Sequence, residues 1–190
     1  MALGNSPWKA LGALGYCSII AVICTARTEA QLLTATLWAD EAYSVYISTS
    51  EVVDGTLFLE GNGGAEDPQT GPIPLVEGVT NYLHIRVKND GGDSCALIGS
   101  FTVGDEFVFS NGAQTITTLL ETDLWRMSRN EFGPPYEYIQ DLGPNGTSPW
   151  GTKDIPGSIV SYLGSENGPG DYYFSLVISP ASFRTSANRY

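Results

Sequence analysis

Aromatic and hydrogen-bonding side chains are concentrated between residues 125 and 151 of this chain. The aromatic members are Phe132, Tyr136, Tyr138 and Trp150, and the polar members are Arg126, Arg129, Asn130 and Asn145. A sugar ring is held by a flat aromatic face against its C–H side and by a few polar groups on its hydroxyls. The predicted ligand-binding residues are therefore Arg126, Tyr136, Tyr138, Asn145 and Trp150.

Acidic residues beside predicted turns are the candidates for metal binding. Calcium takes about six to eight oxygen atoms, which come from carboxylates and loop carbonyls. Asp90 and Asp93 lie on a glycine-containing turn, and Asp40 and Glu41 precede a predicted strand. These four carboxylates are the predicted calcium ligands, with an ordinary solvated turn as the alternative for each pair. Zinc is disfavoured, because there is one histidine and, beyond residue 30, one cysteine.

The residues needed for hydrolytic catalysis are sparse. His84 is the single histidine and shares the outward face of a predicted strand with Arg86 and Lys88, so we expect it on the surface rather than in a triad. The sequence contains no G-x-S-x-G motif, which places a nucleophilic serine after a strand. Paired carboxylates are abundant, but a glycosidase needs two of them at a defined separation across a cleft. We predict that the protein is not an enzyme.

Charge and composition restrict the partners and the fold class. The net charge is −12, from 21 acidic and nine basic residues, and the basic residues form no cluster. Nucleic-acid binding needs Lys and Arg to neutralise phosphates, so this class is excluded, and an anionic membrane is disfavoured. Twenty-two glycines, eleven prolines and 11 % aromatic residues are typical of a β-rich chain with many turns. A length of 190 residues suits one domain.

The first 30 residues have the layout of a secretory signal. Lys9 precedes an apolar run at 10–24, which is shorter than the roughly 20 residues of a membrane span. The small residues of Thr28-Glu29-Ala30 predict cleavage after residue 30, and hence secretion without a membrane span in the mature chain. A buried N-terminal helix and a retained anchor are the alternatives. Cys95 would then be the only cysteine left, and we expect it to be buried.

Alternation of apolar and polar residues predicts the strands that position these groups. The predicted inward-facing side chains of two neighbouring strands are Tyr43, Val45, Ile47, Leu83, Ile85 and Val87. Further strands are expected at 96–103, 106–109, 114–120, 123–128, 159–163 and 172–178, with a loop at 61–72 and a mostly irregular stretch at 130–152. Asn111-Gly112 predicts a hairpin between the strands that flank it. About eight to ten short strands predict an all-β antiparallel sandwich at 31–180, followed by a flexible tail at 181–190.

Several of these segments also resemble a known family. Ala39-Asp-Glu-Ala-Tyr-Ser-Val-Tyr46 resembles the A-D-N/D-x-Y-x-L/V-Y strand of galactose-binding-domain-like jelly rolls. Gly78–Gly92 is similar to the glycine- and asparagine-containing strand that packs beside it, and Thr122–Ser128 resembles the later T/S-D-x-x-W-K/R-x-S element. Pro149-Trp150-Gly151 also fits the pattern of this family. The likeness extends over roughly residues 36–178. This fold is shared by many carbohydrate-binding modules and by accessory domains of rhamnosidase-type enzymes.

The resemblance implies a galactose-binding-like jelly roll and a non-catalytic extracellular module that binds a carbohydrate or glycan. The acidic turn residues add calcium as the expected cofactor of this module. It also implies that Trp125 and Trp150 fill the core, which is the alternative to sugar binding for Trp150. The alternative expectation is that the chain is a structural or assembly subunit of an extracellular surface layer or filament and that it self-associates.

Overall fold

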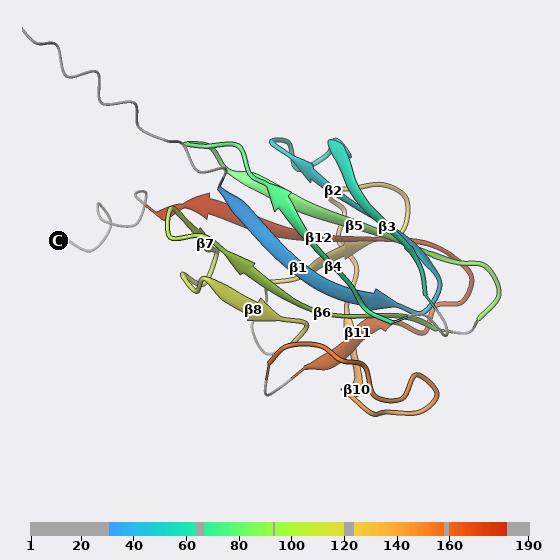
Figure 1. Ribbon diagram of the computed structural model, residues 1–190. Helices are drawn as coiled ribbons and strands as arrows, with labels where there is room; N and C mark the ends of the chain where they lie inside the picture. The colour runs from blue at the N-terminus through green and yellow to red at the C-terminus, as the bar shows by residue number, and fades with distance from the viewer. Residues whose placement is uncertain (1–30, 64–66, 93, 120–123, 158–159, 182–190) are drawn as a thin grey trace, which may run out of the picture.

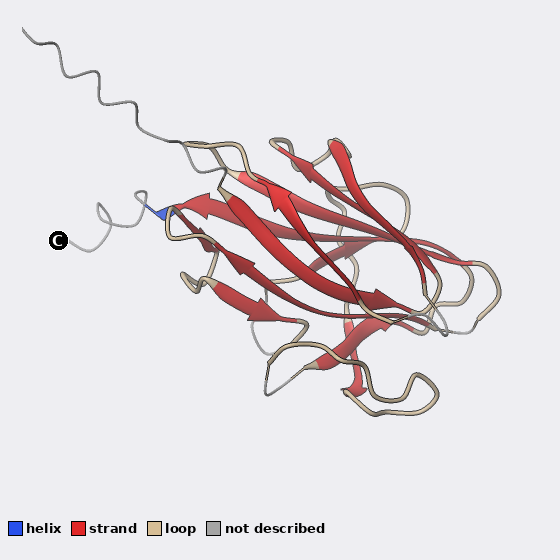
Figure 2. Ribbon diagram, in the orientation of Figure 1, coloured by secondary structure: helices blue, strands red, loops and turns tan. Residues whose placement is uncertain are grey.

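In this computed structural model the described residues are 31–63, 67–92, 94–119, 124–157 and 160–181. They form two facing antiparallel β-sheets, so the predicted all-β sandwich is confirmed (Figure 1). Within these residues the only helical assignment is a turn at Ala181 (Figure 2). The predicted signal at 1–30 and the tail beyond Ala181 lie outside the described residues, as does Asp93.

The first sheet, sheet A, carries the pocket described below. Its strands are β1 (Leu32–Ala39), β4 (Gln69–Pro74), β6 (Cys95–Val103), β8 (Thr115–Thr117), β10 (Gln140–Pro144) and β11 (Ser161–Ser165). They run in the order β10-β11-β6-β1-β4, and β8 also pairs with β6. β6 is central because it pairs with β1 from Leu97 to Val103 and with β11 at its first residues. β10 is thereby held at one edge of the sheet.

The second sheet, sheet B, is built around β5 and β12. Its strands are β2 (Ala42–Ser48), β3 (Thr56–Asn62), β5 (Asn81–Asn89), β7 (Phe107–Phe109), β9 (Arg126–Ser128) and β12 (Gly170–Pro180). They run in the order β3-β2-β5-β12-β7, and β9 also pairs with β12. Ile85 of β5 lies opposite Val45 of β2 on one side and Phe174 of β12 on the other. Three apolar side chains therefore stand side by side on one face.

The hydrophobic core lies between the two sheets. The six predicted inward-facing side chains are all buried, and none of them is more than 5 % exposed. Leu97 and Phe101 of β6 face them from sheet A, and Trp125 is buried in the same cluster, as expected. Burying a large apolar side chain stabilises the fold by about 1.5–3 kcal/mol relative to exposure. Cys95 is a free, buried cysteine, and burial raises the pKa of its thiol.

The predicted hairpin at Asn111-Gly112 is wrong in its pairing. The turn itself forms, because the N–H of Gly112 donates to the carbonyl of Phe109 at 2.7 Å. The two strands then separate, since β7 pairs with β12 in sheet B and β8 pairs with β6 in sheet A. Phe107 and Phe109 thus enter the core from one sheet and Ile116 from the other. The residue types Asn111 and Gly112 determine that the chain turns here. Burial of apolar side chains from both sheets determines which strands β7 and β8 pair with.

Two stretches predicted to lack strands contain one each. β4 begins inside the predicted loop at 61–72, and β10 lies inside the stretch at 130–152. Both contain glycine and proline, which argue against a central strand. Both are edge strands, which need hydrogen bonds on one side only and therefore tolerate these residues.

Gly164→Ala tests the pairing of β11 with β6. A Cβ at this position would lie 1.7 Å from the carbonyl oxygen of Cys95 and 2.8 Å from the Leu142 side chain. The paired backbone must shift to relieve this clash, so we expect the free energy of unfolding to fall by about 2 kcal/mol in urea denaturation.

The matched control is Gly71→Ala in β4, where a Cβ would meet nothing within 4 Å. We expect this variant to change the free energy of unfolding by less than about 0.5 kcal/mol. Equal effects of the two substitutions would contradict the close approach of β11 to β6.

Candidate functional site

An apolar cluster on the outer face of sheet A supports the candidate site. Its buried members are Trp38, Ala96, Ile98, Ile155, Val160 and Tyr162, with Leu142 and Trp150 packed against them. The ring centroid of Tyr162 lies 6.0 Å from that of Trp38 and 5.1 Å from that of Trp150. Its hydroxyl donates to the carbonyl of Gly151 at 2.6 Å, and burial raises the pKa of Tyr162 to about 12. Tyr162 therefore fixes Trp150 and its loop on the sheet.

Asn145, predicted to bind ligand, shapes that same loop. Its Nδ2 donates to the carbonyl of Lys153 at 2.8 Å, and its Oδ1 accepts from the N–H of Lys153 at 2.8 Å. Thr147 adds a third bond, because its hydroxyl donates to the carbonyl of Pro144 at 2.7 Å. The Asn145 amide thus closes the loop that carries Trp150.

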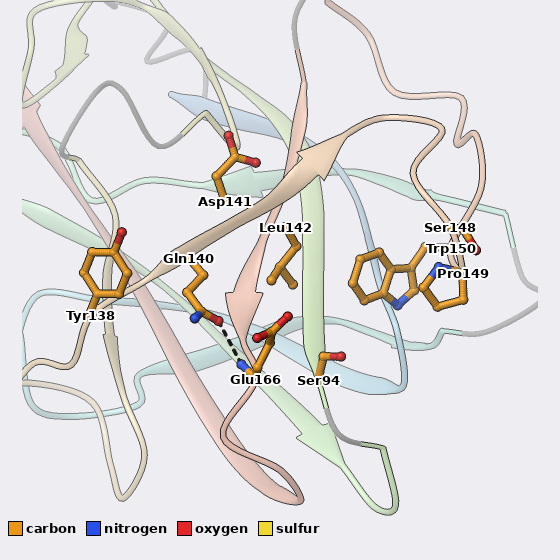
Figure 3. Close-up of a pocket in the computed structure, with 9 residues that line it drawn as sticks. All are labelled: Ser94, Tyr138, Gln140, Asp141, Leu142, Ser148, Pro149, Trp150 and Glu166. Carbon is orange, nitrogen blue, oxygen red and sulfur yellow. Dashed lines mark hydrogen bonds between the residues drawn. The ribbon is translucent and has the colours of Figure 1, made fainter.

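A pocket of about 540 Å³ opens beside this loop (Figure 3). Tyr138 comes from the segment before β10, Ser94 directly precedes β6, and Glu166 directly follows β11. The other lining residues are Gln140, Asp141 and Leu142 of β10 and Ser148, Pro149 and Trp150 of the β10–β11 loop. Two of the predicted ligand-binding residues, Tyr138 and Trp150, are therefore brought to one cavity.

The aromatic rings lie at the two ends of the pocket, and polar groups lie between them (Figure 3). Tyr138 is 76 % exposed, whereas Trp150 is partly buried. Gln140 and Glu166 are neighbours, because the Gln140 Oε1 accepts from the Glu166 N–H at 3.0 Å. The Glu166 carboxylate is directed into the space between Gln140, Leu142 and Ser94 (Figure 3). The arrangement offers flat apolar faces with hydrogen-bonding groups between them.

Arg126 and Tyr136, the remaining predicted ligand-binding residues, lie at a different place. Both contact Glu51 in the β2–β3 connection: Arg126 forms an ion pair with it, and the Tyr136 hydroxyl donates to the same carboxylate. The Arg126 guanidinium lies 5.3 Å from the centroid of the Tyr136 ring. Burial, together with the bond to Glu51, raises the pKa of Tyr136. These three residues form a separate polar cluster beside sheet B.

Glu41 and Asp90, two of the predicted calcium ligands, lie close together. The Glu41 carboxylate accepts a hydrogen bond from the Asp90 N–H, and the Asp90 carboxylate pairs with Lys88 at 2.8 Å. Over the part of the chain that the structure describes, no three His, Cys, Asp or Glu side chains are grouped to hold a metal ion. Asp93 lies outside that part. The calcium site stays a prediction.

Asp40, the fourth predicted calcium ligand, is partly buried next to the aromatic loop. Burial raises the pKa of its carboxyl, and the neighbouring Glu41 adds to the shift. The Trp150 indole and the Lys153 ammonium oppose the shift because both stabilise the ionised form. Asp40 therefore belongs to the surroundings of Trp150.

His84 is buried on the outer face of sheet B, so the prediction that it is exposed is wrong. Its ring stacks on those of Phe132, at 4.1 Å between centroids, and Tyr82, at 6.0 Å. Nε2 lies 3.1 Å from the carbonyl oxygen of Ser50, so it carries the hydrogen, and Nδ1 accepts from the Ser175 hydroxyl at 2.9 Å. Alternation assigned the correct face, but the β9–β10 segment covers that face with Phe132. The His84–Ser175 pair is sealed from solvent.

Five polar lining residues were not selected from the sequence. They are Ser94, Gln140, Asp141, Ser148 and Glu166. They come from four segments, and β10, which carries Gln140 and Asp141, falls in a stretch predicted as irregular. No local spacing connects these residues, so only the pairing of β10, β11 and β6 brings them together.

Comparisons with known proteins give no family for this chain. No match was found among protein-family models, curated proteins or solved structures. Among the described residues, no helix has the length and hydropathy needed to cross a membrane. The resemblance to galactose-binding jelly rolls therefore stays a prediction, and the functional argument rests on the pocket.

The burial of His84 makes the stability of the fold depend on pH. Desolvation lowers the pKa of His84, while the Ser50 carbonyl and the nearby Asp54 and Glu51 oppose the shift. The unfolded chain takes up its proton near the ordinary value of about 6.5, and the folded chain only at lower pH. The contribution of the buried, neutral His84 to the free energy of unfolding is therefore complete above about pH 6.5, and it is lost as the pH falls through the lowered pKa. Because His84 is the single histidine, NMR titration of its ring should give a midpoint below about 6.5.

Phe132→Ala provides the matching variant for this titration. It uncovers the imidazole, so we expect the midpoint to move up towards the ordinary value. Tyr138→Ala removes an exposed ring at the pocket instead and should leave the midpoint unchanged. A native midpoint at or above the ordinary value would contradict the buried, neutral histidine.

Proposed function

We propose that this chain is a secreted, non-catalytic carbohydrate-binding domain and that its sugar site is the pocket between Tyr138 and Trp150. The single observation that carries the proposal is the combination of two aromatic rings with hydrogen-bonding side chains around one open cavity. The volume of about 540 Å³ lies within the range of roughly 300–1,000 Å³ that is usual for small-ligand sites.

The two aromatic rings would serve the apolar side of a sugar. Tyr138 presents an open ring that can stack on the C–H face of a pyranose. Trp150 is held in place by Tyr162, so little conformational entropy is lost there on binding. Ring stacking alone selects few sugars, because most pyranoses have a C–H face.

The polar side chains between the rings would select among sugars. Gln140 and Ser94 carry groups that bond to hydroxyls, and the Glu166 carboxylate accepts strongly from them. We also propose that the sandwich is a jelly roll of galactose-binding type, an architecture that agrees with this function. The predicted secretion agrees with it as well, because extracellular glycans are the expected ligands.

Tyr138→Ala tests the stacking role. We expect the native protein to bind at least one oligosaccharide on a glycan array, and the variant to bind it about tenfold more weakly, the change produced by about 1.4 kcal/mol. The affinities would be measured by isothermal titration calorimetry.

The matched control is Phe58→Ala, which also removes an exposed aromatic ring. Phe58 lies on β3 at an edge of sheet B, whereas the pocket lies at the β10 edge of sheet A. We expect sugar binding to survive this change. Failure of the native protein to bind any glycan would overturn the proposal.

A second candidate function, that of a self-associating structural subunit, is favoured by the edge strand β3. Among the described strands β3 pairs only with β2, so no described strand lies along its other edge. Leu57 and Phe58 on this strand are exposed, as are Val52 and Val53 in the preceding turn. Open edges with apolar side chains are templates for pairing with another chain. A register shift opposite Val45 and Tyr46 partly interrupts the edge.

Leu57→Lys tests self-association through β3. If the edge joins copies, light scattering should show particles that grow with protein concentration, and a lysine on the edge should reduce their size to that of the monomer. Tyr138→Ala is the control and should leave the size unchanged. A native protein that stays monomeric at high concentration would remove this candidate.

A further inference from the structure

The pocket contains carboxylate and no cationic side chain. Glu166 directs its carboxylate into the cavity between Gln140 and Ser94 (Figure 3). Asp141 adds a second carboxylate on the other side of β10 (Figure 3). Its Oδ1 accepts from the Gly143 N–H at 2.9 Å. No lysine or arginine lines the pocket. The lining of the pocket therefore carries negative charge only, from Glu166 and Asp141.

The cations of the described chain are engaged elsewhere. Arg86 pairs with Asp171, Lys88 with Asp90 and Arg126 with Glu51. Arg129 donates to the carbonyls of Asn167 and Pro169, and the Lys153 Nζ lies 3.9 Å from the centroid of the Trp38 ring. None of these contacts involves Glu166. Its exposed carboxylate can therefore accept a cationic group of a ligand.

We propose that the pocket prefers an amino sugar, a saccharide with a protonated primary amine of the glucosamine type. This proposal rests on the proposed function, since it specifies the sugar class for the same pocket. The ammonium would pair with the Glu166 carboxylate, and Gln140 and Ser94 would bond to neighbouring hydroxyls. The open ring of Tyr138 also attracts a cation through its π face.

The same charges act against acidic sugars. A uronate, sulfate or sialate group would face Glu166 without a compensating cation, and like charges at a binding site cost affinity. The net charge of −12 adds an attraction for cationic oligosaccharides at long range. The proposed preference for amino sugars therefore comes both from attraction between the carboxylates and the sugar amine and from repulsion between the carboxylates and acidic sugars.

Isothermal titration calorimetry with three tetrasaccharides of the same β-1,4 linkage separates these contributions. One carries free amines, the second is fully N-acetylated, and the third consists of uronic acids. At neutral pH we expect the free-amine tetramer to bind about tenfold more tightly than the acetylated one, and the uronate to bind least. At alkaline pH, where the amine loses its proton, this advantage should disappear.

Glu166→Gln locates the charge that is responsible. This isosteric change should weaken binding of the free-amine tetramer about tenfold and leave the acetylated tetramer unchanged. Asp141→Asn removes the same charge from the other side of β10 and should change either affinity less than about threefold. Tyr138→Ala must weaken both sugars, because attraction by the general surface charge would not depend on this ring.

The outcomes distinguish the two proposals. Equal affinity for the free-amine and acetylated tetramers, or an unchanged amine preference in Glu166→Gln, would overturn the amino-sugar inference while sugar binding stands. Tighter binding of the uronate would overturn it as well. Absence of binding to all three tetramers and to any glycan on the array would remove both proposals.

Discussion

The structure depends on the exclusion of water between the apolar faces of β5 and β6. Ile85 has Val45 and Phe174 as neighbours on its own sheet, and Leu97 lies in the same buried cluster from the other sheet. In the described chain the one cysteine, Cys95, is free, so hydrophobic burial rather than a covalent cross-link holds the sheets together.

The chain between β9 and β11 gives the two outer faces different properties. Over sheet B, Phe132 closes completely on His84, which leaves the imidazole dry and neutral. Over sheet A, Trp150 packs on Tyr162 but stops short of Tyr138, so a cavity remains at the β10 edge. One stretch of chain thus supplies both the cover of His84 and part of the pocket lining.

The candidate site was predictable only in its aromatic part. Tyr138 and Trp150 are found because aromatic residues in a polar, irregular stretch are unusual. Composition cannot show that Arg126 turns to Glu51 or that Asn145 bonds to its own loop, because both depend on partners distant in space or on loop closure. Glu166, which shares the negative charge of the pocket with Asp141, carries no local signal.

The sequence by itself determined which side chains share a strand face and that Asn111-Gly112 forms a turn. Both are local properties, because a period of two and the preferences of turn residues act over a few positions. The tertiary structure alone decided that β7 and β8 join different sheets, that His84 is covered, and that Glu166 meets Tyr138 and Trp150 at one cavity. These outcomes depend on which segments, distant in the sequence, bury each other. The alternation of apolar and polar residues along one strand carries no information about which distant segment covers it.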